Sequence, residues 1–428
     1  MFNNLLFIIK TCFIVCSELC IYLFTRDYTK LMDGITHRFA SVNILYVKFF
    51  QAIALNNDLI DDKINNKLIK FTDNAPWNYD DIRRIELGEL MKEYDLKFKE
   101  NYKYPINSGM ISLVFLAYNS NTGEPVIIKM KRNNIDNKLN EAIENLNFII
   151  YILSFIPILN NYSIPEVINK NINIIKQQTN FSIEIDNMIR CKKCFKNIKY
   201  IKIPEVMTDS INKYPNFIVM EYINGIKINE IKEEDKNMFS KQLLKFGLIS
   251  PLVHGFMHGD LHAGNLLFIK DETDLKYKHK VGVLDFGIIY DYDDNYKNIL
   301  FELVSTLFTD DIRNITIRMV NFGIFEPLGV IETLSKKEYD LIVNILEEII
   351  IDATRNSKVD IYKIMTDLHI ILNKEEVYNL GLRVNDNVIK IVSMLSMLHG
   401  VIFTLCKDDF SLFFENVVKE LFHTNLLM

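Results

Sequence analysis

Three short pieces of sequence between Val219 and Tyr290 place acidic and amide side chains next to apolar runs, in the order VMEYINGIKI, MHGDLHAGNLLF and VGVLDFGIIY. Asp260 and Asn265 are five positions apart in a loop that precedes the apolar strand LLFI, and Asp285 follows the apolar strand VGVL. The loop carboxylate can orient or deprotonate an attacking group, while the amide oxygen and the second carboxylate can hold a Mg²⁺ ion that bridges phosphates. The set therefore predicts phosphate and metal chemistry.

A lysine lies inside an apolar strand upstream of these motifs. Lys129 stands in VIIKM, where its ammonium group is costly unless it meets an anion such as a phosphate or a carboxylate. The alternative is an edge strand from which the side chain reaches solvent. Before this strand, NSGMISLV predicts a turn, in which only Gly109 and Val114 match the kinase phosphate loop G-x-G-x-x-G-x-V. We assign Lys129, Gly109 and Val114 to nucleotide binding, although the loop alone is a weak signal.

The order of the predicted elements indicates an α+β chain. Helices are predicted over 42–70, 80–93 and 137–199, with strands from 96 to 130. A strand pair formed by YIKIPEV and NFIVMEYI follows, and the remainder from about Lys236 is mainly helical. A small sheet-bearing lobe and a larger helical lobe are therefore expected to join near Glu221–Gly225, with a ligand in the cleft between them.

Composition excludes some classes of function. The 428 residues are 49% apolar and carry a formal net charge of −6, as in a folded globular protein. The compact basic cluster at 276–280 falls in a predicted hairpin tip, so nucleic acid is not an expected partner. The six cysteines include one C-x-x-C pair, Cys191 and Cys194, without the further ligands of a zinc site. We interpret this pair as reduced and helical.

The N-terminal stretch NNLLFIIKTCFIVCSELCIYLFT is long enough to cross a bilayer but contains Lys10 and Glu18. On a helical wheel its polar residues fall within an arc of about 120°. This amphipathic pattern is compatible with packing on the protein's own domain, with a membrane interface, or with a cleaved or spanning segment. No arginine precedes Arg26, so an Arg-rich mitochondrial presequence is not visible.

Four motifs resemble those of the UbiB family, the aarF-domain kinase-like proteins, over the chain from about Val42 to the C-terminal helices. YVKFFQ is similar to the family's K-x-G-Q motif and puts Lys48 and Gln51 at its signature positions, with Phe50 where the family has glycine. QTNFSIEIDN is similar to the E-L-D-F-x-x-E-x-x-N helix, with Gln178 in place of the first glutamate. PINSGMISLVFLA resembles the alanine-rich loop, and HGDLHAGN resembles H-A-D-P-H-P-G-N.

This resemblance implies a bilobal protein-kinase-like fold with a small sheet-bearing N-lobe, a larger helical C-lobe and an N-terminal helical extension. The implied segments are an amphipathic helix and linker over 1–40, the K-x-x-Q extension over 41–95, the N-lobe over 96–224 and the C-lobe over 225–428. The implied cofactors are ATP or ADP with Mg²⁺. The implied setting is lipid or quinone metabolism, as in coenzyme Q biosynthesis, at a membrane that is mitochondrial by family resemblance only.

The resemblance also implies roles for individual residues. Glu184 is the expected partner of Lys129, which would hold the α- and β-phosphates, and Asn187 is the trailing asparagine of the same helix. Asp285 and Asn265 would hold Mg²⁺, and Asp260 would position the acceptor. The remaining expectations concern Glu221 and Tyr222 at the adenine edge, Lys48 and Gln51 reaching the cleft from the extension, His258 packing under Phe286 as a support, and His262 facing either the cleft or solvent.

Three hypotheses for function follow. The first is an active atypical kinase or ATPase that acts on membrane lipids or quinone-pathway intermediates and not on proteins, because the extension would cover the place where a kinase binds its peptide. The second is a catalytically idle scaffold or lipid-binding protein that responds to nucleotide. The third is a phosphotransferase of the aminoglycoside type, whose H-G-D-x-x-x-x-N loop HGDLHAGN also resembles. The phosphate acceptor and the oligomeric state are left open.

Overall fold

The computed structural model falls into two compact units. The first contains 1–189 and 205–222, and the second contains 190–204 and 223–428. The residues that the structure describes are 2–46, 75–99, 104–153, 164–306, 311–355, 380–406 and 410–423. Lys48 and Gln51, with most of the predicted helix 42–70, lie outside the described residues. The four-segment division therefore stays a prediction, although the second unit resumes at Ile223, beside the predicted joint.

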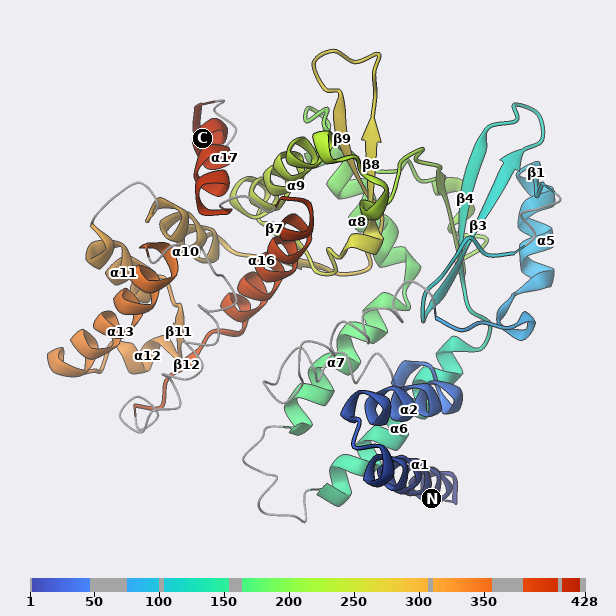
Figure 1. The fold of residues 1–428 in the computed structure, drawn as a ribbon, viewed down its shortest axis with the longest axis horizontal. Helices are drawn as coiled ribbons and strands as arrows, with labels where there is room; N and C mark the ends of the chain where they lie inside the picture. Colours follow the sequence, from blue (N-terminus) through green and yellow to red (C-terminus); the bar gives the residue numbers. More distant parts are fainter. Residues whose placement is uncertain are drawn as a thin grey trace. The chain divides into compact units, whose positions relative to one another are not determined.

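The first unit is built on an antiparallel sheet with the strand order β1-β3-β4-β6, and β2 also pairs with β3 (Figure 1). The strands are β1 Leu96–Lys97, β2 Asn107–Ser108, β3 Ser112–Asn119, β4 Pro125–Lys131 and β6 Phe217–Glu221. β3 and β4 form a hairpin because Asn119 Oδ1 accepts hydrogen bonds from the amides of Asn121 and Thr122, and Gly123 adopts a φ of 76° that favours glycine.

Helices cover this sheet and extend the first unit. They are α1 Phe2–Thr25, α2 Tyr28–Val42, α5 Arg84–Glu93, α6 Ile135–Leu153, α7 Ile164–Gln178 and α8 Phe181–Cys194, the last of which runs on into the second unit. One face of the sheet packs on α5 through a core that includes Leu90, Phe115 and Val219. A second apolar cluster joins α1, α2, α6 and α7.

The second unit combines three small sheets with a helical body. Its sheets have the strand orders β5-β9-β8 and β10-β7, and a further pair joins β11 to β12. The strands are β5 Ile201–Lys202, β7 Phe256–His258, β8 Leu266–Lys270, β9 His279–Val283, β10 Ile289–Asp291, β11 Phe325–Glu326 and β12 Arg383–Val384. The helices are α9 Glu233–His254, α10 Asp294–Ser305, α11 Ile312–Asn321, α12 Leu328–Ile331, α13 Lys336–Arg355, α16 Asp386–Leu405 and α17 Phe410–His423.

The α+β class is confirmed, and two local predictions are corrected. The helix predicted from residue 80 begins at Arg84, because Asn78 caps a short 3₁₀ turn over Tyr79–Asp81 first. The pairing of YIKIPEV with NFIVMEYI is wrong for most of its length, since β5 pairs parallel with β9 and only Val206 bridges to β6. Pro204 lies between the two contacts, and its missing N–H interrupts a ladder at the point where the chain changes sheets.

Candidate nucleotide and metal site

The sheet of the first unit holds the predicted lysine–glutamate pair. β4 is an interior strand, flanked by β3 and β6, so the edge-strand alternative for Lys129 is wrong. Lys129 is only 7% exposed, and its Nζ lies 2.6 Å from Oε1 of Glu184. Glu184 is in the first turn of α8, where the helix dipole favours a carboxylate. The predicted ion pair is present and buried.

Two other predicted residues lie on or beside the same strands. Val114 of β3 is directly opposite Lys129 in the antiparallel register, and directly opposite residues share a face of the sheet. Gly109 lies in the turn between β2 and β3, where its amide donates to the carbonyl of Ser112 at 2.9 Å. The structure therefore places Val114 beside the lysine and Gly109 at the neighbouring hairpin turn.

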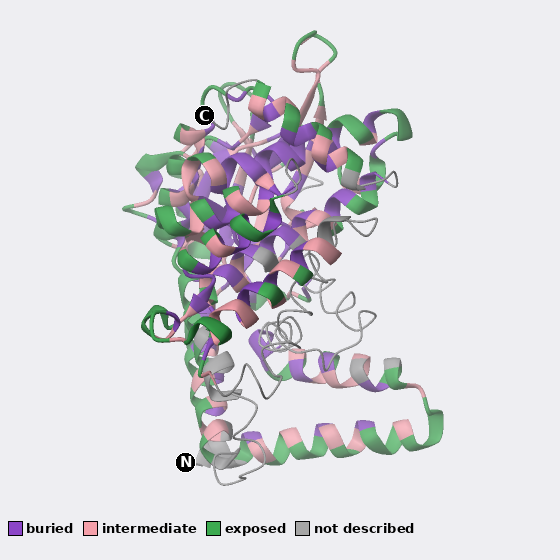
Figure 2. Ribbon diagram, turned by 90° about the vertical axis from the view of Figure 1, so that its left-hand side faces the viewer, coloured by how far each residue is buried: buried purple, intermediate pink, exposed green. Residues whose placement is uncertain are grey.

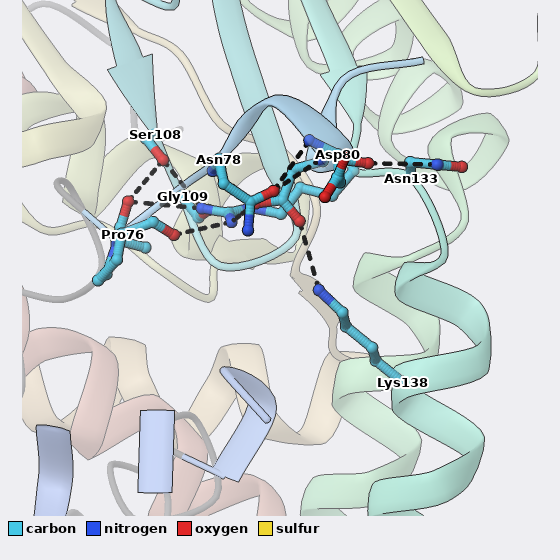
Figure 3. Close-up of polar contacts among 10 residues, drawn as sticks. Pro76, Asn78, Asp80, Ser108, Gly109, Asn133 and Lys138 are labelled. Carbon is cyan, nitrogen blue, oxygen red and sulfur yellow. Dashed lines mark hydrogen bonds and ion pairs between the residues drawn. The ribbon is translucent and has the colours of Figure 1, made fainter. Parts of the chain in front are cut away.

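A buried arginine, which the sequence analysis missed, anchors that turn. Arg132 directly follows β4 and is 1% exposed. Its Nη2 and Nε atoms lie 2.7 and 3.0 Å from the carbonyl oxygen of Gly109, and its Nη2 also donates to Ser108 Oγ at 2.9 Å (Figure 3). The guanidinium therefore ties the turn of the predicted nucleotide loop to the strand that carries Lys129.

The same arginine holds the segment that enters the sheet from the extension. Its Nη1 lies 2.9 Å from Oδ2 of Asp81 and 2.9 Å from the carbonyl oxygen of Pro76. Asp81 also accepts from Lys138 of α6 at 3.3 Å (Figure 3). Burial lowers the pKa of Arg132, and the Asp81 carboxylate opposes that shift. An arginine after an apolar strand reads as exposed, so the local sequence gave no signal of this network.

The predicted adenine edge is the end of β6. The amide of Glu221 donates to the carbonyl of Glu205 at 2.8 Å, and Oε2 of Glu221 accepts from the Glu205 amide at 3.2 Å. Tyr222 follows, half-buried, as the last residue of the first unit. The Glu221 amide already donates to the backbone, so any adenine contact at this edge would have to use other groups of the segment.

Two strand pairs of the second unit bring its acidic motifs side by side. β7 pairs with β10, and the amide of Gly259 donates to the carbonyl of Ile288 at 2.8 Å. β8 pairs with β9, and the amide of Leu284 donates to the carbonyl of Asn265 at 3.0 Å. The loop 259–265 therefore lies beside residues 284–288 at both of its ends.

Side-chain contacts fix the orientation of the three predicted residues in this loop pair. Nδ2 of Asn265 donates to the carbonyl of Asp260 at 2.8 Å and lies 3.1 Å from Nε2 of His262. The amide nitrogen is thus committed to protein, so Oδ1 is the atom that can bind a cation. Oδ1 of Asp285 accepts from the amide of Gly287 at 2.9 Å. His262 lies against Asp260 as well, with Nε2 3.8 Å from the carboxylate.

The donor set of this loop pair fits Mg²⁺. An amide oxygen from Asn265 and a carboxylate from Asp285 are hard ligands, and Mg²⁺ is commonly held by one or two such groups together with phosphate oxygens and water. Within the described ranges, no group of three or more His, Cys, Asp and Glu side chains is placed to hold a metal ion, so the candidate ligands here are one amide and one carboxylate. Burial raises the pKa of Cys191 to about 12, which keeps this member of the C-x-x-C pair a thiol at neutral pH.

His258 packs against Phe286, as predicted, with ring centroids 5.3 Å apart in an edge-on arrangement. Its Nδ1 accepts from the amide of Asp260 at 3.2 Å, so the proton of the neutral ring is on Nε2. Burial lowers the pKa of His258, and the nearby carboxylates of Asp285 and Asp260 oppose that shift without cancelling it. The ring is therefore a neutral support beneath the loop.

This burial predicts a pH dependence of stability. The unfolded chain binds a proton at His258 near pH 6.5, whereas the folded chain does not until a lower pH, so the free energy of unfolding should fall as the pH drops below about 6.5. His258→Asn should reduce this slope by up to about 1.4 kcal/mol per pH unit, measured by denaturant unfolding at pH 5.5 and 7.5. An unchanged slope in His258→Asn would contradict the assignment.

Several known proteins are similar to this chain in sequence. The model of the ABC1 atypical kinase-like domain matches residues 70–319, which is more than half of the chain. A protein of Arabidopsis thaliana named activity of BC1 complex kinase 7, chloroplastic, is 22% identical over 309 residues, or 71% of this chain and 43% of the relative. A probable protein kinase UbiB of Shewanella baltica is 24% identical over 286 residues, or 65% of this chain and 51% of the relative.

A solved structure supports the fold. The Rv3197–erythromycin complex from Mycobacterium tuberculosis aligns with a TM-score of 0.50 at 15% identity, covering 87% of this chain and 90% of that one. The chain spans about half the length of the curated relatives it matches. The loop HGDLHAGN resembles loops of two families, and the family match selects the ABC1 kinase-like one over the aminoglycoside type. The chain therefore belongs to the ABC1 atypical kinase-like family, which includes the UbiB proteins, and has the bilobal protein-kinase-like fold of that family.

Proposed function

We propose that the protein is an ATP- and Mg²⁺-dependent atypical kinase or ATPase. The observation that carries this proposal is the complete set of chemical groups on ordered elements, namely the buried Lys129–Glu184 pair in the first unit and the Asp260, Asn265 and Asp285 cluster in the second. Relatives are named as protein kinases, which supports phosphoryl transfer as the class of reaction.

Each group has a defined task in this proposal. Glu184 holds the ammonium group of Lys129 in place to neutralise phosphate oxygens. Asn265 Oδ1 and the Asp285 carboxylate hold Mg²⁺, which supplies charge neutralisation on the phosphates when bound. Asp260 orients the attacking hydroxyl or water and accepts its proton. Its backbone contacts with His258 and Asn265 hold the loop in position for that step.

We infer a lipid or quinone-pathway intermediate as the phosphate acceptor and a membrane as the place of action. Support comes from the resemblance to UbiB proteins and from α1, the segment Leu6–Thr25 of which is long and apolar enough to cross a membrane by length and composition. A chloroplast relative and bacterial relatives are both found, so the compartment does not follow from family membership.

The nucleotide site is tested by thermal shift. ATP or ADP with Mg²⁺, at a thousandfold excess over a micromolar Kd, should add about 4 kcal/mol to the free energy of unfolding and raise the Tm by several degrees. Lys129→Ala and Asp285→Asn should each abolish most of the shift, because one removes the phosphate contact and the other a metal ligand. A folded wild-type protein that shows no metal-dependent shift would contradict the proposal.

A further inference from the structure

α1 carries its acidic residue on the side that faces the protein. Glu18 is 4% exposed, and its Oε1 lies 2.8 Å from Nε of Arg38 on α2. Nη1 of the same arginine donates to Ser17 Oγ at 2.7 Å. Thr11 Oγ1 is also buried. The helix therefore directs these polar groups toward the protein, whereas the polar groups of a surface helix in water normally face solvent.

The outward face of α1 is continuously apolar. Phe13 is 69% exposed and Phe24 is 90% exposed. At 100° per residue, the exposed arc opposite Glu18 consists of Leu6, Ile9, Cys12, Phe13, Cys16, Leu19, Cys20, Leu23 and Phe24. Figure 2 shows exposed residues along the whole outer side of this helix. Large exposed apolar faces of this kind mark contacts with lipid or protein.

The charged side chains around this face indicate which kind of membrane it would bind. Within residues 6–30 the exposed charged side chains are Lys10, Arg26 and Lys30, all cationic, and the two acidic side chains, Glu18 and Asp27, are paired with Arg38 and Lys30. A cationic rim around an apolar face suits the surface of an anionic membrane. A spanning arrangement would take Glu18 away from Arg38 and into hydrocarbon, so the contacts favour a helix that lies along the surface.

Three reduced cysteines stand in the middle of this face. Cys12, Cys16 and Cys20 are spaced by four, so they form one line along the helix, and all three are exposed. Reduced cysteines are usually among the most buried residues, as Cys191 and Cys406 are here. A line of exposed thiols within an apolar face is a chemical feature that packing does not explain.

We propose that α1 lies along an anionic membrane and that Cys12, Cys16 and Cys20 are sites of S-acylation by long-chain fatty acids. This inference rests on the proposed membrane association. The sulfur attacks the carbonyl carbon of a fatty acyl-coenzyme A, the bond from that carbon to the coenzyme A sulfur breaks, and coenzyme A leaves as the thiol with the proton. A single weak membrane-binding feature gives reversible binding, whereas two together give stable anchoring. The apolar face of α1 would be the first feature and would bring the thiols to the membrane. The acyl chains would be the second and would hold the helix there.

The test counts hydroxylamine-sensitive thioesters on the full chain made in a eukaryotic host, by exchanging each acyl group for a mass tag. The wild type should carry one to three tags. Cys12→Ser/Cys16→Ser/Cys20→Ser should carry none and should lose membrane sedimentation at least tenfold. The matched variant, Cys191→Ser/Cys194→Ser/Cys406→Ser, should keep the wild-type tags. A wild type without tags, or tags that persist in the first variant, would overturn the proposal.

A second variant tests the lipid face itself. Phe13→Asp/Leu23→Asp keeps all six cysteines but makes the face polar, so it should lose the tags with the membrane contact. Tags at the wild-type level would contradict the lipid face. A lipid-free chain that changes from dimer to monomer on this substitution would show that a second copy covers the face instead. The nucleotide thermal shift should be the same in all cysteine variants, so failure of this inference and failure of the kinase proposal are separable.

Discussion

Asp260→Asn is expected to lower ATP turnover about 10²- to 10⁴-fold, because an amide cannot accept the proton of the attacking group. Nucleotide binding should survive, since the metal ligands Asn265 and Asp285 are unchanged. The loop should also keep its shape, because the contacts of Asp260 with His258 and Asn265 are made by its backbone amide and carbonyl. Phosphate release under single-turnover conditions measures the loss, and the thermal shift with ATP and Mg²⁺ measures the binding.

The matched control is Asp294→Asn, whose carboxylate is 95% exposed in the same unit and should leave turnover unchanged. Wild-type turnover in Asp260→Asn would remove this residue from the chemistry. A wild type that binds nucleotide with Mg²⁺ but releases no phosphate, with or without candidate lipids, would instead favour the idle, nucleotide-responsive scaffold, which would retain its biological function in Asp260→Asn.

Arg132→Met is expected to lower the free energy of unfolding by about 3–5 kcal/mol. The substitution retains much of the side-chain volume but leaves the buried Asp81 carboxylate, the carbonyl of Gly109 and the hydroxyl of Ser108 without their shared donor. The nucleotide loop should loosen too, so Kd for ATP should rise in the folded variant. Urea unfolding and isothermal titration measure the two effects.

An exposed arginine gives the matched control. Arg318 pairs with a carboxylate too, through two hydrogen bonds to Glu302, but it lies on the surface, so Arg318→Met should cost less than about 1 kcal/mol. Asp81→Asn should destabilise Arg132→Met less than it destabilises the wild type, because the charge pair is already broken. A loss in Arg132→Met as small as that in Arg318→Met would show that the network is not a structural anchor.

Local sequence pattern was enough to predict which polar residues lie together, because its signals are short. Asp260, Asn265 and Asp285 lie immediately beside strands that their own apolar neighbours form, so strand pairing brings them together without further information. Lys129 predicted a buried ion pair because a charged side chain inside an apolar strand needs a group of opposite charge. The family motif then identified Glu184 as that group. Both inferences use spacing within about ten residues or one known motif.

Pairing between distant strands and the burial of polar side chains were harder to predict from the sequence. The switch of β5 from β6 to β9 depends on a partner some eighty positions away, and two runs of β-formers in succession suggested the simpler hairpin. Arg132 binds groups from two segments that are far apart in the sequence, and neither segment identifies the other. For α1, the helical wheel predicted a polar arc, but only the position of Arg38 shows that Glu18, within this arc, faces the protein.

The position of the Glu18 carboxylate limits which residues can replace those around it on α1 and α2. A Cβ atom added at Gly34 of α2 would lie 2.1 Å from the Glu18 carboxylate, so any side chain there would drive the acid from its place beside Arg38. Positions 18, 34 and 38 should therefore covary: among homologues with this helix pair, loss of glycine at 34 should accompany loss of the acid at 18 and of the base at 38. An alignment in which positions 18, 34 and 38 vary independently would show that the carboxylate at position 18 can take another conformation.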